Sequence, residues 1–381
     1  MSGTDGTNGP GPASSDLRAA VVLTQCWHRV PGGTARSVLD LVAAVVARGG
    51  ADLVGLGPRG GPPRHGFEPP VPVARTSLPL PYLYDAWHGL RRPGLPRSLG
   101  RLDVVHVTAP VVPPTGPVPM VATVHDLLPV TRPDLLTRRG ARLLRRGLEI
   151  VRDSAQVVMV PSAVVADDCR TFGIEDARLR VVPWGATPVG PGPAEVAAVR
   201  SRYGVAGPYL LFVGTLEPRK NLARLVAAVA RLGRPDLTLV VTGPAGWGDD
   251  LPDPSVQGVR AVLAGHVPAA DLPALMAGAE VFCFPSLAEG FGLPVLEAMS
   301  AGAPVVTSSG TACAEVVGDA GVLVDPEDVD AVAAGLAQVL DDADLAGQLR
   351  RAGRVRAADF TWTAVADATV AAYRSAAGGA R

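Results

Sequence analysis

Lysine is almost absent from this chain of 381 residues. Lys and Arg together number 35, but only Lys220 is a lysine, and Asn and Ile occur twice each, at Asn8, Asn221, Ile150 and Ile174. Such avoidance suggests a GC-rich coding sequence, in which Arg replaces Lys wherever either residue will serve. We therefore expect Lys220, with Asn221 beside it, to take part in chemistry that an arginine cannot perform.

Other scarcities exclude whole classes of function. The four cysteines match no zinc or redox spacing: Cys26, Cys169, Cys283 and Cys313. They therefore favour buried thiols in a reducing, cytoplasmic setting over disulfides or a metal site. A net charge of −1 argues against nucleic acid as a partner. A run of about 18 apolar residues, which a membrane span would need, is missing. Residues 1–15 have neither a basic start nor an apolar run, so they predict a disordered tail and not a signal peptide.

Short valine-rich runs alternate with stretches of helical period, which is typical of parallel sheets flanked by helices. Strands are expected at 19–24, 51–56, 103–107, 120–125, 156–160, 178–182, 209–213, 237–242, 259–264, 281–284, 304–307 and 321–324. Helices are expected at 34–48, 135–152, 162–172, 221–232, 269–277, 294–301 and 326–340, and two Ala-rich helices follow. Pro and Gly interrupt the pattern at 184–193 and mark a linker. The fold class is therefore α/β, with two tandem Rossmann-like doubly wound domains and a cleft between them.

The predicted linker separates two halves of opposite charge. Residues 1–185 contain 21 Arg, 12 Asp and 3 Glu, a net charge of +6, whereas the remainder carries −7. Such halves suit two domains that face different ligands, although a drift of charge over solvated surfaces explains the asymmetry equally well.

Two turns between a strand and a helix are candidates for binding phosphate. Gly32 and Gly33 precede the first long helix, where their backbone N–H groups can approach a ligand or simply form a tight turn. In the second half, the turn 214–221 places Arg219 and Lys220 where a helix is expected to begin. Two positive charges oppose the helix dipole there, so we interpret them as a site for the two phosphates of a nucleotide rather than as a solvated pair.

A third turn follows the strand expected at 281–284. Gly290 and Gly292 allow a ligand to approach the backbone closely. Glu289 precedes the next helix and Glu297 lies one turn into it, so the two carboxylates can face one sugar or ribose diol. The simpler alternative is a helix cap at Glu289 and a surface residue at Glu297.

His125 and Asp126 follow the strand expected at 120–125. A histidine at the carboxyl end of a strand points into the crevice of the first domain, although a lone histidine is more often structural. His106, in the strand before it, is expected to be structural.

Together these segments resemble the retaining GT-B glycosyltransferases of family 4. The resemblance covers nearly the whole ordered chain and rests on Gly32-Gly33, Thr123-Val124-His125-Asp126, Pro161-Ser162-Ala163, the segment 212–221, the Glu289…Glu297 pair and the segment 301–307. The spacing of the two glutamates and the Arg219-Lys220-Asn221 turn are its specific parts.

The resemblance implies a nucleotide-sugar donor bound by the second domain and an acceptor bound by the first. It implies catalytic roles for His125, Arg219, Lys220 and Glu289. It implies donor contacts from Gly33, Gly214, Thr215, Gly290, Phe291, Gly292, Leu293 and Glu297, and acceptor-side positions for Gly32 and Asp126. It implies an acceptor domain at 16–185, a donor domain at 186–358 and a helix at 359–381 that crosses back to the first domain.

Two positions depart from the family pattern. Thr215 stands where many members have Arg, so Arg219 is expected to supply the charge, as in a branch of mannosyltransferases. GDP-mannose is therefore the first expected donor. Trp184 stands where many members have Asn, which leaves the floor of the cleft unspecified.

The expected reaction moves a hexose to an acceptor hydroxyl with retention of configuration. No metal and no cofactor are expected, because Arg219 and Lys220 can meet the charge of the leaving phosphate. The alternatives are a nucleotide-sugar epimerase or hydrolase, and a non-catalytic protein that binds sugar nucleotides.

The acceptor is expected to be a saccharide, a lipid-linked sugar or a small molecule, in polysaccharide, glycolipid or natural-product synthesis. The predicted helix 135–152 carries five arginines opposite a leucine-rich face: Arg138, Arg139, Arg142, Arg145 and Arg146. Such a helix suits peripheral contact with an anionic membrane, or an ordinary core-facing helix with a solvated face.

Overall fold

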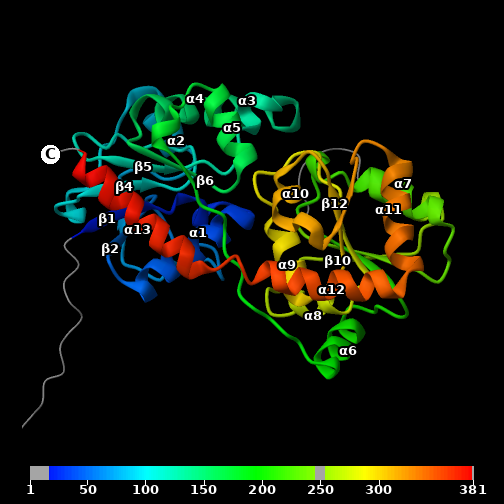
Figure 1. Cartoon of the computed structure of the whole chain (residues 1–381). Coiled ribbons are helices and arrows are strands. Elements are labelled where there is room, and N and C mark those ends of the chain that lie inside the picture. The colour runs from blue at the N-terminus through cyan, green and yellow to red at the C-terminus, as the bar shows by residue number, and fades with distance from the viewer. Residues whose placement is uncertain (1–16, 245–253, 380–381) are drawn as a thin grey trace, which may run out of the picture.

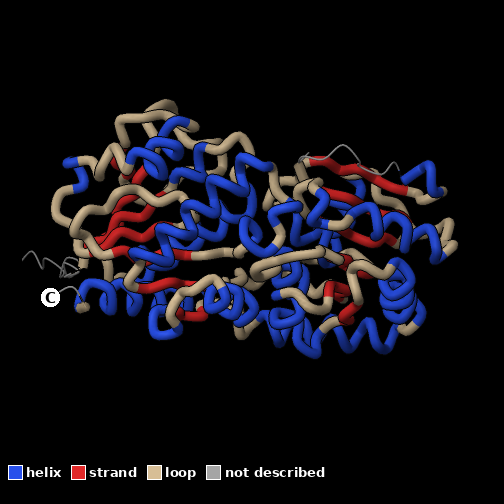
Figure 2. The backbone as a smooth tube through the Cα atoms, turned by 90° about the horizontal axis from the view of Figure 1, so that it is seen from above, coloured by secondary structure: helices blue, strands red, loops and turns tan. Residues whose placement is uncertain are grey.

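The computed structural model describes residues 17–244 and 254–379, so the tail predicted at 1–15 lies outside the described residues. Two sheets lie side by side, and helices cover both faces of each (Figures 1 and 2). Both sheets are parallel throughout, with strand orders β3-β2-β1-β4-β5-β6-β7 and β10-β9-β8-β11-β12-β13. This arrangement confirms the prediction of two doubly wound units.

The strands of the first lobe are β1 (Arg18–Val22), β2 (Asp52–Gly57), β3 (Val73–Arg75), β4 (Val104–Val107), β5 (Met120–Thr123), β6 (Val157–Val160) and β7 (Leu179–Val181). Those of the second lobe are β8 (Tyr209–Val213), β9 (Thr238–Thr242), β10 (Ala261–Gly265), β11 (Val281–Phe284), β12 (Val305–Ser308) and β13 (Val322–Val324). The sequence pattern missed only β3 among these, because three residues between prolines are too short to show an alternation.

The helices that carry the argument in the first lobe are α1 (Gly32–Arg48), α4 (Arg138–Ser154) and α5 (Ala163–Thr171), with the short α2 (Tyr82–Asp85) and α3 (Leu128–Thr131). The second lobe contains α6 (Pro193–Arg202), α7 (Leu222–Leu232), α8 (Leu272–Ala277), α9 (Leu293–Ala301), α10 (Ala312–Val317), α11 (Val329–Asp341) and α12 (Ala343–Ala357). The last helix is α13 (Trp362–Gly378). Short 3-10 and π turns complete the described chain. The helices α2, α3, α6 and α10 are not among the predicted ones.

The order of strands reverses at one point in each sheet. This point lies between β1 and β4 in the first lobe and between β8 and β11 in the second. Loops diverge from the sheet at such a point and leave a crevice at the carboxyl ends of the strands. The turns 214–221 and 285–292 follow β8 and β11, so the fold brings these two predicted segments together.

The helix α13 packs against α1 and against the middle strands of the first sheet. Arg48 on α1 forms an ion pair with Asp367 on α13 at 2.7 Å. The ring of His106 is fully buried, and its two nitrogens lie 2.8 Å from the hydroxyls of Tyr373 and Thr123. His106 is therefore a structural histidine of the core, as expected.

Two further sequence expectations concern cysteines and membrane spans. All four cysteines are buried free thiols, and burial raises their pKa values. Within residues 17–244 and 254–379, no helix has the length and apolarity to cross a bilayer.

Substitution by alanine should change the free energy of unfolding in opposite directions at two glycines in helix interiors. A Cβ at Gly147 of α4 would lie 1.8 Å from the carbonyl oxygen of Pro110, whereas a Cβ at Gly347 of α12 would meet only the end of the Arg351 side chain. We expect Gly147→Ala to lower the free energy of unfolding by about 2 kcal/mol or more, because backbone must move. Gly347→Ala should raise it by up to about 1 kcal/mol. Chemical denaturation of both variants tests this, and equal effects would contradict it.

Candidate functional site

The turn after β8 is held in shape by Asn221. This residue has left-handed backbone angles, φ 62° and ψ 31°, which asparagine tolerates better than most residues. Its side-chain amide donates hydrogen bonds to the carbonyl oxygens of Pro285 at 2.9 Å and Pro326 at 2.6 Å. Asn221 therefore fixes the turn that carries Lys220 against the loop that follows β11.

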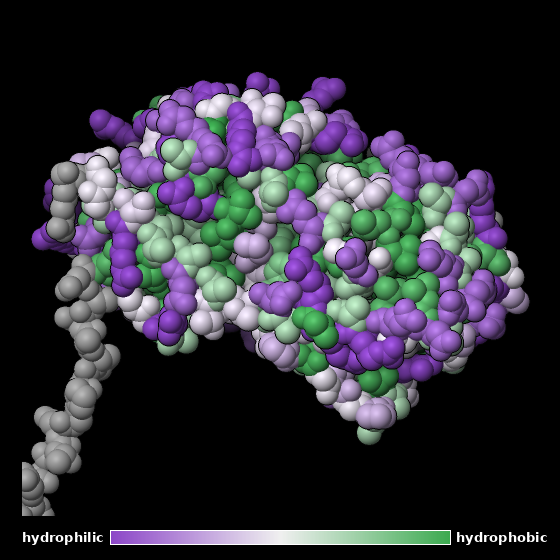
Figure 3. All heavy atoms as spheres, in the orientation of Figure 1, coloured by the Kyte–Doolittle hydropathy of each residue, from purple (hydrophilic) through white to green (hydrophobic). Residues whose placement is uncertain are grey.

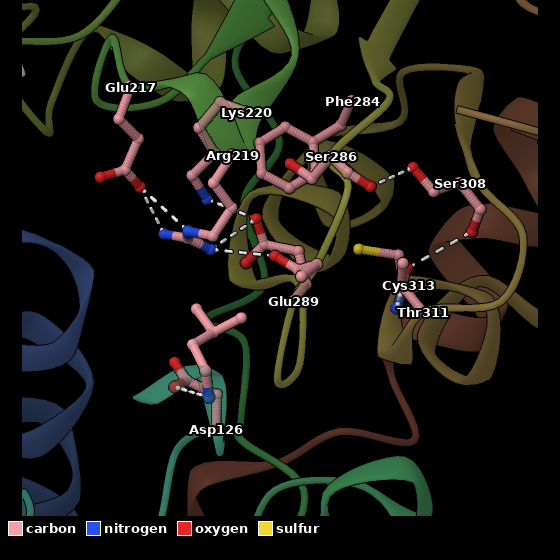
Figure 4. Close-up of polar contacts among 12 residues, drawn as sticks. Asp126, Glu217, Arg219, Lys220, Phe284, Ser286, Glu289, Ser308, Thr311 and Cys313 are labelled. Carbon is pink, nitrogen blue, oxygen red and sulfur yellow. Dashed lines mark hydrogen bonds and ion pairs between the residues drawn. The ribbon is translucent and has the colours of Figure 1, made fainter. Parts of the chain in front are cut away.

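The side chain of Glu289, in that second loop, lies between the two cations of the turn (Figure 4). Its Oε1 atom is 2.6 Å from Nζ of Lys220 and 3.0 Å from Nη1 of Arg219. Lys220 also lies over the ring of Phe284 at 4.6 Å, and Arg219 forms a second ion pair with Glu217 at 2.6 Å. The side chains of Lys220 and Glu289 are only 10% and 9% exposed. We call Arg219, Lys220 and Glu289 the charged cluster.

Burial and charge act in opposite directions on these groups. Burial alone would raise the pKa of Glu289, but the charges of Arg219 and Lys220 hold it below its ordinary value. Burial lowers the pKa of Lys220, and Glu289 opposes that shift. Glu289 therefore stays ionised, and we take the cluster as a charged arrangement within a protected crevice.

Two cations at the start of a helix would by themselves indicate an external anion. In the structure the chain supplies an anion of its own, Glu289, so a site for nucleotide phosphates stays a prediction. Arg219 and Lys220 also lie in the 3-10 turn Pro218–Lys220, just before α7 begins at Leu222. Their charge alone therefore does not require a ligand.

His125 lies two residues beyond β5, at the edge of the first lobe. Its Nε2 is 2.8 Å from the carbonyl oxygen of Thr108, so this nitrogen must carry the proton and donate. The ring stacks on Trp184, with centroids 5.4 Å apart and planes 20° apart. Burial of the ring lowers the pKa of His125, so the imidazole is neutral and Nδ1 is its unprotonated nitrogen. Neither Thr108 nor the role of Trp184 as a stacking partner was found from the sequence.

The two lobes touch where Gly290 meets His125. A Cβ at Gly290 would lie 1.7 Å from the backbone oxygen of His125 and 3.2 Å from Cβ of Asp126, so no larger residue fits. The hydroxyl of Ser162, in the first lobe, donates a hydrogen bond of 2.8 Å to the carbonyl oxygen of Gly290. The structure thus brings His125 and Asp126 next to the loop of the charged cluster. Figure 4 shows Asp126 below that cluster.

The other glycine of that loop, Gly292, is also required by its surroundings. Gly292 has φ 104°, and a Cβ there would lie 2.7 Å from Sγ of Cys313. It precedes Leu293, the first residue of α9. Phe291 is buried and packs edge-on against Phe360 in the segment that returns to the first lobe.

Glu297 occupies a different place from Glu289. It lies on α9 and lines a cavity of about 210 Å³ between the lobes, opposite Arg36 and Asp40 on α1. Its side chain still reaches solvent, but burial within the cavity, with a smaller contribution from the charge of Asp40, raises the pKa of Glu297 to about 7 against the opposing charge of Arg36. The linker residues 185–187 and Trp362 also line this cavity.

Gly32 and Gly33 begin α1. Gly32 has φ 68°, and no heavy atom lies within 4 Å of a Cβ built at either residue. The backbone here faces open space, which leaves room for a ligand, and its role stays a prediction. Gly214 and Thr215 continue the chain from β8 toward the charged cluster, and a Cβ at Gly214 would contact the Lys220 side chain at 3.7 Å. Their donor contacts likewise stay a prediction. Among the described residues, no group of three or more His, Cys, Asp or Glu side chains could hold a metal ion.

Comparison with known proteins matches both lobes to known families. Residues 31–189 match the model described as Glycosyltransferase Family 4, and residues 207–342 match the one described as Glycosyl transferases group 1. O-antigen chain mannosyltransferase B of Escherichia coli is 36% identical over 265 residues, which are 67% of this chain and 70% of that protein. MMP alpha-(1->4)-mannosyltransferase of Mycolicibacterium hassiacum is 35% identical over 280 residues, 68% of this chain and 66% of its own length.

Solved structures match the fold over most of the chain. HepE of Anabaena, in complex with UDP-glucose, has a TM-score of 0.75 at 20% identity and covers 93% of this chain and 98% of its own. Sucrose-phosphate synthase of Thermosynechococcus elongatus has a TM-score of 0.73 at 21% identity and covers 94% and 98%. At such low identity the likeness shows the two-lobed GT-B fold alone.

The raised pKa of Glu297 predicts a dependence of stability on pH. A carboxyl group whose pKa is raised on folding costs stability as pH rises from its unfolded value toward about 7, because the folded protein retains the proton longer. We expect Glu297→Gln to raise the melting temperature above pH 7 and to have no effect near pH 4. The gain should be about 1 kcal/mol, since contact with solvent screens the charge. Thermal scans from pH 4 to 8 test this.

The matched control is Glu195→Gln, which changes an exposed glutamate of α6 in the same lobe. Its effect on the melting temperature should not grow with pH as that of Glu297→Gln does. Parallel melting curves for the two variants at every pH would contradict the assignment.

Proposed function

The chain belongs to glycosyltransferase family 4, and from that premise we propose that it moves a hexose, first of all mannose, from a nucleotide-diphosphate sugar to an acceptor hydroxyl with retention of configuration. The acceptor would be a saccharide, a lipid-linked sugar or a small molecule. The charged cluster at the reversal point of the second sheet is the observation that carries the proposal.

The cluster supports a site for a leaving diphosphate. Arg219 and Lys220 are held at the carboxyl end of β8, and both face one carboxylate, Glu289. An incoming diphosphate would take over the two cations, and its charge would replace that of Glu289. The freed carboxylate would need new donors, and the hydroxyls of the donor sugar are such groups. Binding of the phosphates by the two cations would thus free Glu289 to bind the sugar, so the two events would be coupled.

The neutral state of His125 suits a reaction in which positive charge builds on the sugar. Burial lowers its pKa, so the ring adds no positive charge beside the reacting carbon. A protonated ring would repel that charge. Its bond to the carbonyl of Thr108 and its stack on Trp184 fix the orientation of the ring.

Retention requires the new bond to form on the face that the phosphate leaves. In the proposed step, the bond from the anomeric carbon to the phosphate oxygen breaks, and the acceptor oxygen bonds to that carbon. The acceptor proton passes to the leaving phosphate. Arg219 and Lys220 meet the charge on the phosphate, so we propose that the transfer needs no metal ion and no cofactor.

GDP-mannose is the first donor to test, because two relatives above 30% identity are mannosyltransferases. UDP-glucose is the second, because HepE is solved in complex with it. Glu297 would bind the ribose of either nucleotide, and the backbone of Gly33 would approach the phosphates from the first lobe.

Loss of Lys220 should cost turnover with little change in fold. We expect Lys220→Ala to lower kcat at least about 100-fold, because one preorganised cation for the leaving phosphate is removed. The measurement is release of GDP from GDP-mannose with a panel of saccharide and lipid-linked acceptors, and proton NMR of the product determines its anomeric configuration.

The control for this experiment is Arg231→Ala, which removes an exposed arginine paired with Asp330 at the far end of α7. It should keep full turnover. Near-normal kcat in Lys220→Ala would contradict the assignment. Free mannose released without acceptor would instead indicate a hydrolase, and binding of donor without turnover would indicate a non-catalytic binding protein.

The basic helix α4 supports a second proposal, peripheral contact of the first lobe with anionic lipid. Its leucine-rich face packs on the lobe, with Leu148 and Val151 buried, so the arginine face points outward. On that face Arg139 pairs with Asp85, and Arg145 and Arg146 pair with Glu149. Hydrophilic side chains gather over this part of the lobe (Figure 3). Two large apolar side chains, Tyr82 and Leu90, are 66% and 76% exposed in the segments that precede α4 in the chain.

Reversal of charge on this face should abolish lipid binding. Each arginine near an anionic surface contributes about 1 kcal/mol, so Arg142→Glu with Arg145→Glu should remove the attraction. Flotation with vesicles of phosphatidylglycerol and phosphatidylcholine at low salt tests it, with Arg231→Glu on the second lobe as the control. If the unchanged protein fails to float, α4 is an ordinary surface helix.

A further inference from the structure

Glu315, on α10 of the second lobe, forms a contact that crosses to the first lobe. Its Oε2 atom accepts a hydrogen bond of 2.8 Å from the backbone N–H of Ala163, and Oε1 accepts one of 2.7 Å from Val164. These two residues begin α5, and the two helices are in contact (Figure 1). One carboxylate therefore binds two adjacent backbone donors on the other lobe.

This contact provides hydrogen-bond acceptors for the first backbone N–H groups of α5. The first N–H groups of a helix have no partner within the helix, and the helix dipole makes that end positive. The Ser162 hydroxyl accepts from the N–H of Val165, and Glu315 accepts from the two N–H groups before it. The first turn of α5 is thus completed by a carboxylate from the other lobe, and hydrogen bonds to a charged acceptor are the stronger kind.

The backbone of Glu315 is held to the rest of the second lobe by hydrogen bonds. The guanidinium of Arg356, on α12, donates to the carbonyl oxygens of Glu315 at 3.0 Å and Val316 at 3.2 Å. Cys313, in the same short helix, packs against Gly292 in the loop of the charged cluster. Movement of α10 relative to the first lobe would therefore carry the loop 289–292 with it.

We call the contact of Glu315 with the N–H groups of Ala163 and Val164 the clasp, and Ser162 connects it to the reaction site. Ser162, next to the N–H groups that Glu315 binds, donates to the carbonyl of Gly290, and Gly290 rests on His125. Opening at Glu315 would separate Ser162 from Gly290, and with it the loop of Glu289 from His125. The two contacts are successive points along one seam between the lobes.

We propose that Glu315 is a positioning residue that holds the two lobes closed and so seats the loop 289–292 against His125. It acts through Ser162 and Gly290 and touches no reacting atom. The link to catalysis rests on the function proposed above, whereas the closure of the lobes does not.

Two variants break the clasp from opposite sides. Glu315→Ala removes both acceptor atoms. Ala163→Pro removes one donor and should leave α5 intact, because proline is favoured at the first position of a helix. The residue before it, Ser162, already has the extended angles, φ −152° and ψ 162°, that precede a proline. The matched control is Asp328→Ala, because Asp328 caps α11 by accepting from Asp330 and Ala331 within the second lobe.

We expect both clasp variants to increase the radius of gyration in small-angle X-ray scattering without donor, and Asp328→Ala to leave it unchanged while lowering the melting temperature. In the transfer assay, Glu315→Ala should lower kcat about tenfold or more, as loss of charge-assisted hydrogen bonds shifts the closed fraction. KM for the donor should change less, because its proposed ligands lie mainly on the second lobe. Effects of the two variants should be less than additive in the double variant.

An unchanged radius of gyration in both clasp variants would overturn the proposal, even if transfer activity is found. An increased radius with unchanged kcat would overturn the positioning role and leave only a structural contact. If no sugar donor is turned over, the proposed function fails, but scattering still decides whether Glu315 closes the lobes.

Discussion

The ion pairs between Glu289 and the two cations Arg219 and Lys220 are the interaction on which the site depends. A carboxylate is costly to bury unless it is paired, and removal of one partner of such a pair leaves an uncompensated charge. Here the pair is formed by residues of two different loops: the two cations follow β8 and Glu289 follows β11. The switch in strand order puts these loops side by side, and Asn221 ties them together through the carbonyl of Pro285.

The same cluster explains how two cations are held in one crevice. Glu289 faces both Arg219 and Lys220, so each of the two cations has a partner within the chain. The single lysine of the chain fits this place physically. Its compact ammonium group sits on the face of Phe284 and meets one carboxylate oxygen, which a planar guanidinium fork would do less well.

The second constraint is the close contact between the lobes. Gly290 touches the backbone of His125, and next to that point the lobes are also joined by Ser162 and by Glu315. Beyond it, Glu297 and Asp40 face a common cavity with Arg36, where two carboxylates approach each other. The seam therefore combines tight packing and hydrogen bonds, which hold the lobes together, with two like charges, which repel each other.

Parallel strands buried on both faces must be continuous apolar runs and their helices must be amphipathic, so the class of fold and most of its elements can be predicted from the sequence. It also pointed to Lys220, Asn221 and the two glutamates through scarcity and spacing. It could not show that Glu289 neutralises Lys220, that Trp184 supports His125, or that Glu315 completes α5. Those contacts join residues far apart in the chain, and only the packing of two lobes decides which side chains meet. The charge of a residue can be read from its letter, but its partner is fixed by the tertiary structure.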